Sequence, residues 1–236
     1  MNDSYAALAE HYDLIMTSGY YDYEGYARRL LSHLPPRAKV LELGVGTGLV
    51  CEHLLRSAPA GVRLTGIDHS PSMLARARPR LGRRVRLLEQ DVTHLDLAGT
   101  FDVAYSVGGV WLWLGAGDHM RLGSHLLDDA DNARGLRHLA QALRPGAALL
   151  LSVQEAHRPC ERVLPGGFVY AQDVHEHGNG RITKDYEVRR GDTVVAHQRS
   201  TYRLFSRLEA DRLLRQCGFE PYPADEENLF RRYLRT

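Results

Sequence analysis

Hydrophobic and polar positions recur with two different periods along the chain. Short apolar runs bounded by turn residues predict strands, and longer stretches with apolar residues three or four positions apart predict helices. The strands expected from this pattern lie at about 38–43, 62–67, 84–89, 101–107 and 145–153, and the helices between them at about 48–57, 71–81 and 131–143. Because strand and helix alternate, we expect right-handed crossovers and a parallel sheet with helices on both faces.

Capping residues and prolines locate the ends of the predicted helices more closely. Ser70 is a predicted N-cap with Pro71 at the first helical position, and Pro79 is expected to end or kink the same helix. Ser206 and Glu209 have the spacing of a capping box. The other elements expected are a helix at 23–33, a helix from Ser206 to Cys217 that Gly218 stops, and closing strands near 219–223 and 228–234.

The segment from 154 to 205 lacks helical periodicity. Its runs FVYAQDVHEH, RITKDYEVRR and TVVAHQRSTYRLF read as strands, and the turn sequences HGNG and RGD separate them. These runs predict a three-stranded meander inserted after the fifth strand. We expect this meander to act as a cap.

Composition and charge exclude several classes of protein. The chain has 236 residues, is 44% hydrophobic and carries a net charge of +1 without a long run of like charges, so no nucleic-acid partner is expected. Its longest apolar stretch, about 147–153, is too short to span a membrane, and no export signal is visible. The three isolated cysteines suggest neither a disulfide framework nor a zinc site. These features predict a soluble, cytoplasmic protein.

The candidate ligand site begins at residues 40–48, VLELGVGTG. Gly44, Gly46 and Gly48 follow an apolar strand and open a helix, so backbone N–H groups there favour an acceptor or an anion. A nicotinamide-binding turn, G-x-G-x-x-G, would need glycine at position 49, which is Leu49. Asp68 ends the second strand and is placed to accept hydrogen bonds from ribose hydroxyls. We therefore expect a nucleoside with an acidic or zwitterionic tail.

Four motifs in order resemble a known family. VLELGVGTG, then GIDHSPSML, then Asp91-Val92 after the third strand, and then FDVAYSVGGVWLW with LRPGA look like the class I S-adenosylmethionine-dependent methyltransferases, over about residues 38–153. The resemblance implies S-adenosylmethionine as cofactor, with its methionine part on the glycine turn, its ribose on Asp68, and its adenine on Met73 and the Asp91-Val92 pair. Asp102, by contrast, stands at the opposite end of its strand. The candidate cofactor-binding residues are Tyr12, Glu42, Gly44, Gly46, Gly48, Asp68, Met73, Asp91, Val92 and Ser106.

Two segments near the ends of the chain resemble one subgroup of this family. SYAALAEHYDLIM is similar to the N-terminal segment of small-molecule N-methyltransferases, including glycine and deoxyamino-sugar enzymes, which implies that Tyr12 contacts the methionine end of the cofactor. YRLFSRLEADRLLRQCGFE resembles their last helix and strand. The stretch GVWLWLGAGDHM matches no specific substrate class. Tyr20, Trp111 and Trp113 are candidate substrate contacts, and we expect one tryptophan to face the pocket; the alternative is that Trp111, Trp113, Met73 and Tyr12 serve only in packing.

In methyl transfer, the proton of the acceptor group has to be removed. An amine acceptor must be neutral and a hydroxyl benefits from a base, so a histidine or carboxylate near the methyl group would help. His119 is the first candidate, followed by His157 and Glu155; the alternative is that the histidines are exposed loop residues. No metal site is expected, because the HEH sequence at 175–177 has no further ligand to complete a set.

The pattern and the resemblance together predict an α/β fold. We expect a doubly wound, Rossmann-like, mostly parallel sheet of seven strands, with a small antiparallel β cap inserted after strand 5. The expected parts are an N-terminal arm and helix covering the site (1–37), an S-adenosylmethionine-binding core (38–153), an inserted β-meander substrate cap (154–205), and a C-terminal helix and strand pair that complete the core (206–236).

The expected function is methylation of a small-molecule acceptor in specialised metabolism, by in-line displacement. An amine is favoured over a hydroxyl or a carbon. One alternative is a non-catalytic S-adenosylmethionine-binding protein that uses the insert as a partner surface. Another is a nucleotide-dependent oxidoreductase, which Leu49 disfavours. The sequence does not fix the oligomeric state, and a homodimer is compatible with it.

Overall fold

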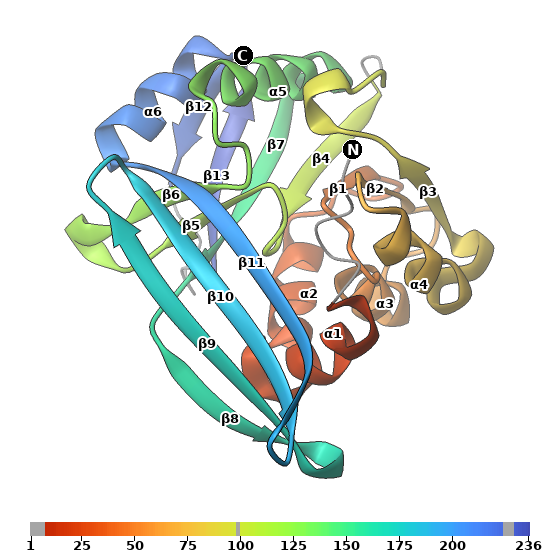
Figure 1. Ribbon diagram of the computed structural model, residues 1–236. Coiled ribbons are helices and arrows are strands. Elements are labelled where there is room, and N and C mark those ends of the chain that lie inside the picture. The colour runs from red at the N-terminus through yellow and green to blue at the C-terminus, as the bar shows by residue number, and fades with distance from the viewer. Residues whose placement is uncertain (1–7, 98–99, 224–228) are drawn as a thin grey trace.

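The computed structural model describes residues 8–97, 100–223 and 229–236, without the side chains of Tyr20 and Asp118. An N-terminal helical arm leads into an α/β core, and long antiparallel strands extend from that core past the arm (Figure 1). The helices are α1 (Ala9–Ile15), the π-helical turn η1 (Met16–Tyr20), α2 (Tyr23–Ser32), α3 (Leu49–Ser57), α4 (Pro71–Leu81), α5 (Asp129–Ala142) and α6 (Arg207–Gln216). The strands are β1 (Lys39–Leu43), β2 (Arg63–Asp68), β3 (Val85–Glu89), β4 (Phe101–Ser106), β5 (Trp111–Leu114), β6 (Arg121–Ser124), β7 (Leu143–Gln154), β8 (Cys160–Leu164), β9 (Phe168–His177), β10 (Arg181–Arg190), β11 (Thr193–Phe205), β12 (Phe219–Tyr222) and β13 (Phe230–Arg235). Among the described helices, none is long and apolar enough to cross a membrane.

Strand β1 lies at the centre of the parallel part of the sheet. Val40 pairs with Leu64 of β2 on one side and with Val103 of β4 on the other, and all three strands run parallel. The order is β3-β2-β1-β4-β7, and the antiparallel strands β13 and β12 continue it beyond β7. The turns that follow the parallel strands therefore meet at one edge of the sheet, which is where ligands bind in such folds.

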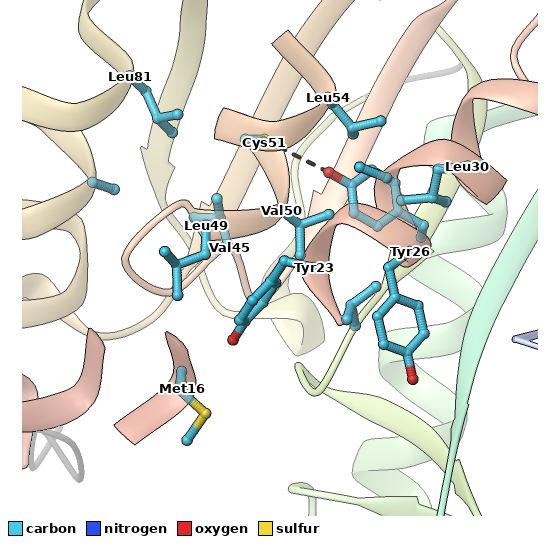
Figure 2. Packing of buried hydrophobic residues seen from close by; sticks show 14 of the residues in the cluster. Met16, Tyr23, Tyr26, Leu30, Val45, Leu49, Val50, Cys51, Leu54 and Leu81 are labelled. Carbon is cyan, nitrogen blue, oxygen red and sulfur yellow. Dashed lines mark hydrogen bonds between the residues drawn. The ribbon is translucent and has the colours of Figure 1, made fainter. Parts of the chain in front are cut away.

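Alternate residues of the strands supply hydrophobic cores on the two faces of the sheet. On one face Val40 belongs to a cluster with side chains of α2, α3 and α4. Figure 2 shows Leu30, Leu54 and Leu81 of this cluster. On the other face Leu41 packs with α5 and α6 through residues such as Leu136. This arrangement confirms the predicted sheet with helices on both faces.

The structure confirms the predicted helix caps, whereas Pro79 differs from the prediction. The Ser70 hydroxyl accepts a hydrogen bond from the N–H of Met73 at 3.3 Å, as an N-cap should. Ser206 and Glu209 form both hydrogen bonds of the capping box, at 2.7 and 3.3 Å. Pro79 does not end α4, which continues to its limit two residues later. A proline so close to the end of a helix removes a single backbone hydrogen bond, which the last turn tolerates.

The predicted meander is part of a larger sheet. Strands β9, β10 and β11 match the three predicted runs, and β8 adds a fourth strand at the outer edge. Phe205 of β11 pairs with Leu122 of β6, and Trp113 of β5 pairs with Val153 of β7, so the meander is hydrogen-bonded to the core through the β5–β6 hairpin. The described residues form one 13-stranded sheet. The expected seven strands therefore describe the core part only, because the β5–β6 hairpin and β8 gave no alternating pattern.

Candidate active site

The turn after β1 has a backbone conformation that favours glycine. Gly44, Gly46 and Gly48 have φ angles of +70°, +54° and +85°, a region that other residues rarely adopt. A Cβ atom on Gly44 would lie 2.8 Å from Cα of Gly109, so the turn touches the loop after β4 at backbone distance. A Cβ atom on Gly46 would meet no atom within 4 Å. The turn thus offers bare backbone beside open space.

Asp68, the last residue of β2, holds the glycine turn in place. Its Oδ2 accepts a hydrogen bond from the Gly46 N–H at 2.8 Å, and its Oδ1 accepts one from the Ser70 N–H at 2.9 Å. Asp68 also lines the pocket described next, so its carboxylate both fixes the turn and faces the space beside it.

A pocket opens at the carboxyl ends of the parallel strands. Its empty volume, including the open mouth, is about 810 Å³. Seven of the ten candidate cofactor residues line it, namely Tyr12, Gly44, Gly46, Asp68, Met73, Asp91 and Val92. The other lining residues are Ile67, His69, Gln90, Gly108, Gly109, Val110, His125 and Leu126. We call this cavity the cofactor pocket.

One end of the cofactor pocket combines an apolar surface with a hydrogen-bond acceptor. Met73 and Val92 are buried and contribute the apolar part. Asp91 Oδ1 accepts a hydrogen bond from the Thr93 N–H at 2.8 Å. The Oε1 atom of Gln90 is buried and has no hydrogen-bond partner among the described residues. These groups fit an adenine ring with its exocyclic amine, and Asp68 fits the adjoining ribose.

Glu42 lies behind the glycine turn and borders a smaller cavity there. Its Oε2 accepts hydrogen bonds from the Cys51 thiol and the Tyr105 hydroxyl, both at 2.8 Å. Burial raises the pKa of Glu42 to about 7; the charge of Asp68 adds to the rise, and the two hydrogen bonds oppose it. Glu42 thus titrates near neutral pH inside the protein.

The two other candidate cofactor residues lie away from the cofactor pocket. Gly48 is the N-cap residue of α3, and a Cβ atom there would lie 2.6 Å from a methyl carbon of Leu81. Ser106 is fully buried at the end of β4, and its hydroxyl has no hydrogen-bond partner among the described residues. Gly48 thus shapes the turn by close packing, and neither residue lines the cofactor pocket.

The structure separates the predicted base candidates. His119 is exposed in the 3₁₀ turn η4 (Gly117–His119), which closes the β5–β6 hairpin. The open end of that hairpin lies at the cofactor pocket, where Val110 and His125 are hydrogen-bonded through their backbones at 3.0 Å. His119 is therefore at the far end of the hairpin, and the expectation that it faces the methyl group is corrected. Glu155 is exposed and lines neither the cofactor pocket nor the second pocket described below.

Trp111 and Trp113 point into the core beside α5 and α6. Both are almost fully buried, and Trp111 Nε1 donates a hydrogen bond to Asn132 Oδ1 at 2.7 Å. Residues two apart on a strand lie on the same face, so the expectation that one tryptophan faces the pocket is corrected. Leu112, on the opposite face of β5, packs against the meander instead. The side chain of Tyr20, the third predicted substrate contact, lies outside the described residues.

A second pocket adjoins the first between the arm and the inner face of β10 and β11. We call it the inner pocket; its lining residues are Leu8, Tyr12, Met16, Tyr21, Gly108, Leu112, His157, Lys184, Tyr186 and Tyr202. Tyr12 and Gly108 line both pockets, so the two are neighbours. Of the three predicted base candidates, only His157 lies at this junction.

Two histidines near the junction are held neutral. Burial lowers the pKa of His157 to about 3, and Lys184 and His125 add to the effect. Burial also lowers the pKa of His125 to about 4, with His69 and Lys184 as the smaller causes. The rings of His125 and His157 lie 4.4 and 5.7 Å from the ring of Tyr202. Both imidazoles are therefore free of positive charge at neutral pH.

Sequence reasoning missed Gln90, His125 and Lys184. Gln90 precedes the predicted Asp91, so its place at the end of β3 was a usable signal. His125 and Lys184 come from the end of β6 and from the middle of β10. No motif or spacing marks these two residues, because only the pairing of the meander with the core brings them to the pockets.

Comparisons with known proteins identify a methyltransferase domain in this chain. Residues 40–146 match the family model described as "Methyltransferase domain". Carboxy-S-adenosyl-L-methionine synthase of Chromohalobacter salexigens is 32% identical over 51% of this chain and 41% of that protein. Glycine/sarcosine N-methyltransferase of Parasynechococcus marenigrum is 29% identical over 68% of this chain and 50% of that protein. The chain thus spans half or less of the length of these curated relatives.

A solved structure shares the fold along nearly the whole chain. CalS10, an amino pentose methyltransferase from Micromonospora echinaspora whose structure has S-adenosylmethionine bound, is 21% identical and superposes with a TM-score of 0.68. The match covers 95% of this chain and 96% of that chain. The matched residues include Gly44, Gly46, Asp68 and Asp91, which line the cofactor pocket. The resemblance seen in the sequence motifs is confirmed: residues 40–146 match a methyltransferase domain, and the whole chain shares the fold of a structure that has S-adenosylmethionine bound.

Proposed function

We propose that this protein transfers the methyl group of S-adenosylmethionine to an amine of a small molecule, in specialised metabolism. The observation that carries the proposal is the junction of two pockets at Tyr12 and Gly108. One pocket has the groups that suit a nucleoside, and the arm and the meander enclose the other. The choice of an amine rests on the glycine/sarcosine N-methyltransferase and the amino pentose methyltransferase among the similar proteins.

The cofactor supplies an activated methyl group, so the residues of the chain bind, orient and exclude water. Asp68 would accept hydrogen bonds from the ribose hydroxyls, and Met73 would hold the adenine. The backbone of the glycine turn beside Gly46 would hold the methionine part. Apolar side chains of the inner pocket, such as Met16 and Leu112, keep water from the acceptor.

The acceptor amine has to lose its proton before it attacks. An imidazole whose pKa is lowered to about 3 is too weak a base to hold that proton, so we assign to His157 the task of accepting a hydrogen bond from the amine once it is neutral. Its imidazole is neutral, it lines the inner pocket, and its Nδ1 atom is buried without a hydrogen-bond partner among the described residues. His125 lines the neighbouring cofactor pocket and is the second candidate.

The proposal gives each part of the chain a role. Residues 1–37 cover the site, 38–153 bind the cofactor, 154–205 form the substrate cap and 206–236 complete the core. The partner is a small molecule and not a nucleic acid, and the protein works in the cytoplasm as a monomer or a homodimer. Three free thiols, Cys51, Cys160 and Cys217, support a reducing compartment.

Mass spectrometry of a methyl-transfer reaction tests this proposal. The protein is incubated with S-adenosylmethionine that carries a deuterated methyl group and with a panel of small amines, amino acids and amino sugars. We expect one acceptor to gain the deuterated methyl on nitrogen, with S-adenosylhomocysteine formed in equal amount. Cofactor binding without transfer to any acceptor would favour the silent binding protein. Because one relative makes carboxy-S-adenosyl-L-methionine, the adenosyl products are measured as well, and a modified adenosyl product would contradict methyl transfer.

A further inference from the structure

A buried asparagine joins the two loops at the open end of the β5–β6 hairpin. Asn132 lies in the first turn of α5 and is fully buried. Its Oδ1 atom accepts hydrogen bonds from Trp111 Nε1 at 2.7 Å and from the Ser124 hydroxyl at 2.6 Å. Its Nδ2 atom donates to the carbonyl oxygens of Leu126 at 2.8 Å and Asp128 at 2.9 Å. One amide therefore contacts β5, β6 and the loop from β6 to α5.

These four hydrogen bonds fix the orientation of the amide. An indole N–H can only donate and a carbonyl oxygen can only accept, so a flipped amide would present the wrong atom to both kinds of partner. Asparagine is a poor helix former, and a buried amide costs free energy unless it is hydrogen-bonded. A buried polar network whose members are all satisfied favours one arrangement of its parts. Asn132 thus contributes to the arrangement of the two loops more than to the formation of α5.

The loops that this amide joins form one wall of the cofactor pocket. Five of the fifteen described residues that line the pocket belong to the loops at 107–110 and 125–128, namely Gly108, Gly109, Val110, His125 and Leu126. The His125 N–H donates to the Val110 carbonyl at 3.0 Å, and the Leu126 N–H donates to Ser124 Oγ at 3.1 Å. Asn132 does not line the pocket itself. It supports this wall through the residues that do.

Helix α5 also lies close to a neighbouring part of the pocket. A Cβ atom on Gly135 would be 3.2 Å from side-chain atoms of both Trp111 and Val92, and Val92 lines the cofactor pocket. Residues three apart in a helix share a face, so Asn132 and Gly135 present the same face of α5 to the pocket wall. The helix therefore has little room to shift against that wall.

We propose that Asn132 is a positioning residue for the cofactor pocket. Its amide joins the loop after β4 to the loop after β6, and so fixes the wall that these loops form before the cofactor binds. A wall that is already in place spares the ligand the cost of ordering it. The inference rests on the proposed function, in which this pocket binds the adenosyl cofactor.

Two tryptophans of β5 supply a matched test by calorimetry with S-adenosylhomocysteine. Trp111 and Trp113 lie on the same face of the strand and are 0% and 2% exposed, but only Trp111 donates to Asn132. Trp111→Phe should bind the ligand about three- to tenfold more weakly than the wild type, because one hydrogen bond to the amide is lost. Trp113→Phe removes the same indole N–H from the same strand and should bind as the wild type does. Equal affinities in the two variants would overturn the inference.

Amide hydrogen exchange followed by NMR tests the positioning role without a ligand. Asn132→Leu keeps the approximate volume of the side chain and removes all four hydrogen bonds. The N–H groups of His125 and Leu126 should exchange about tenfold faster or more in this variant, because the wall opens locally. The Gly46 N–H, which donates to Asp68 on another part of the pocket, should exchange at the wild-type rate. Equal acceleration at all three positions would indicate general destabilisation and would contradict the positioning role.

The outcomes separate this inference from the proposed function. A wild type that does not bind S-adenosylhomocysteine overturns the proposed function, whereas the exchange measurement still tests the wall. A wild type that binds the ligand, with unchanged affinity in Trp111→Phe, overturns the positioning role alone. Should Asn132→Leu fail to fold, the two tryptophan variants decide the question.

Discussion

At the scale of single residues, Asp68 connects the glycine turn to the ligand. Its carboxylate binds the backbone of Gly46 and Ser70 and also lines the cofactor pocket. A hydrogen bond to a charged group contributes about 1.5 to 3 kcal/mol. Asp68→Ala should therefore weaken S-adenosylhomocysteine binding about 10- to 100-fold, as measured by calorimetry.

A matched control for Asp68→Ala lies at the opposite ends of the strands. Asp102 accepts a hydrogen bond from the Lys39 N–H at 2.7 Å and forms an ion pair with Arg144 at 2.8 Å, away from the cofactor pocket. Asp102→Ala should leave the affinity for S-adenosylhomocysteine unchanged. Equal affinities in the wild type and Asp68→Ala would remove Asp68 from the site.

Glu42 makes the stability of the protein depend on pH. Its pKa is raised to about 7 in the folded state from 4.5, so its favourable contribution is complete below pH 4.5 and is lost as the pH rises through 7. Glu42→Gln keeps an acceptor for Cys51 and Tyr105 and removes the charge. Its free energy of unfolding, relative to the wild type, should be about 2 to 3 kcal/mol higher at pH 8 than at pH 5. Urea unfolding measures this difference.

Glu89 offers the comparison for that experiment. It is exposed at the end of β3, and Glu89→Gln should show the same difference from the wild type at both pH values. A Glu42→Gln variant with no pH-dependent difference would mean that the Glu42 carboxyl is not held protonated near neutral pH.

The residues of the cofactor pocket that were predictable are those with a local signal. Gly44, Gly46 and Asp68 stand at fixed distances from strand ends, so spacing alone located them. His119 follows β4 in the sequence, but it lies at the closed end of the β5–β6 hairpin, which the sequence did not predict. Lys184 carries no local signal, because its position depends on pairings between strands that are far apart in the chain.

At the scale of elements, the N-terminal arm is fastened to the glycine turn. Asp13 of α1 accepts hydrogen bonds from the Thr47 hydroxyl at 2.6 Å and from Arg80 of α4 at 2.5 Å. Arg80 also donates to the Thr47 carbonyl at 2.5 Å. The arm, which brings Tyr12 to both pockets, is thus fixed by contacts with the turn and with α4.

Loss of this attachment should loosen the arm and weaken cofactor binding. Arg80→Ala should lower the affinity for S-adenosylhomocysteine several-fold and speed limited proteolysis within the first twenty residues, with little change in the unfolding temperature. Arg78→Ala, at an exposed position of the same helix, is the control. If both variants bind the ligand as the wild type does, the contacts of Arg80 do not hold the arm over the site.

How well a strand could be predicted depends on which of its faces are buried. In β10, buried and less buried residues alternate along the strand, and its predicted limits match the structure. All four residues of β5 are buried, so it shows no alternation, and β8 has a single buried residue at its end. Periodicity reveals a strand with one covered face far better than one with both faces covered or both largely open.

At the scale of the whole molecule, one continuous sheet carries both pockets. The parallel strands end at the cofactor pocket, and β10 and β11 form a wall of the inner pocket. The order β7-β5-β6-β11-β10 joins these regions by hydrogen bonds. The two pockets are therefore held at a fixed separation, which would favour transfer between ligands bound in them. The sequence predicted the parallel core and the meander, but not the β5–β6 hairpin that connects them.

The identity of the cofactor is the central question about the pocket at the strand ends. Parallel calorimetric titrations of the purified protein with S-adenosylmethionine, S-adenosylhomocysteine and NAD would test it. We predict that both adenosyl ligands bind with one site per chain, and that NAD does not bind. Binding of NAD alone would contradict the account, because the glycine turn and Asp68 would then serve a nicotinamide dinucleotide.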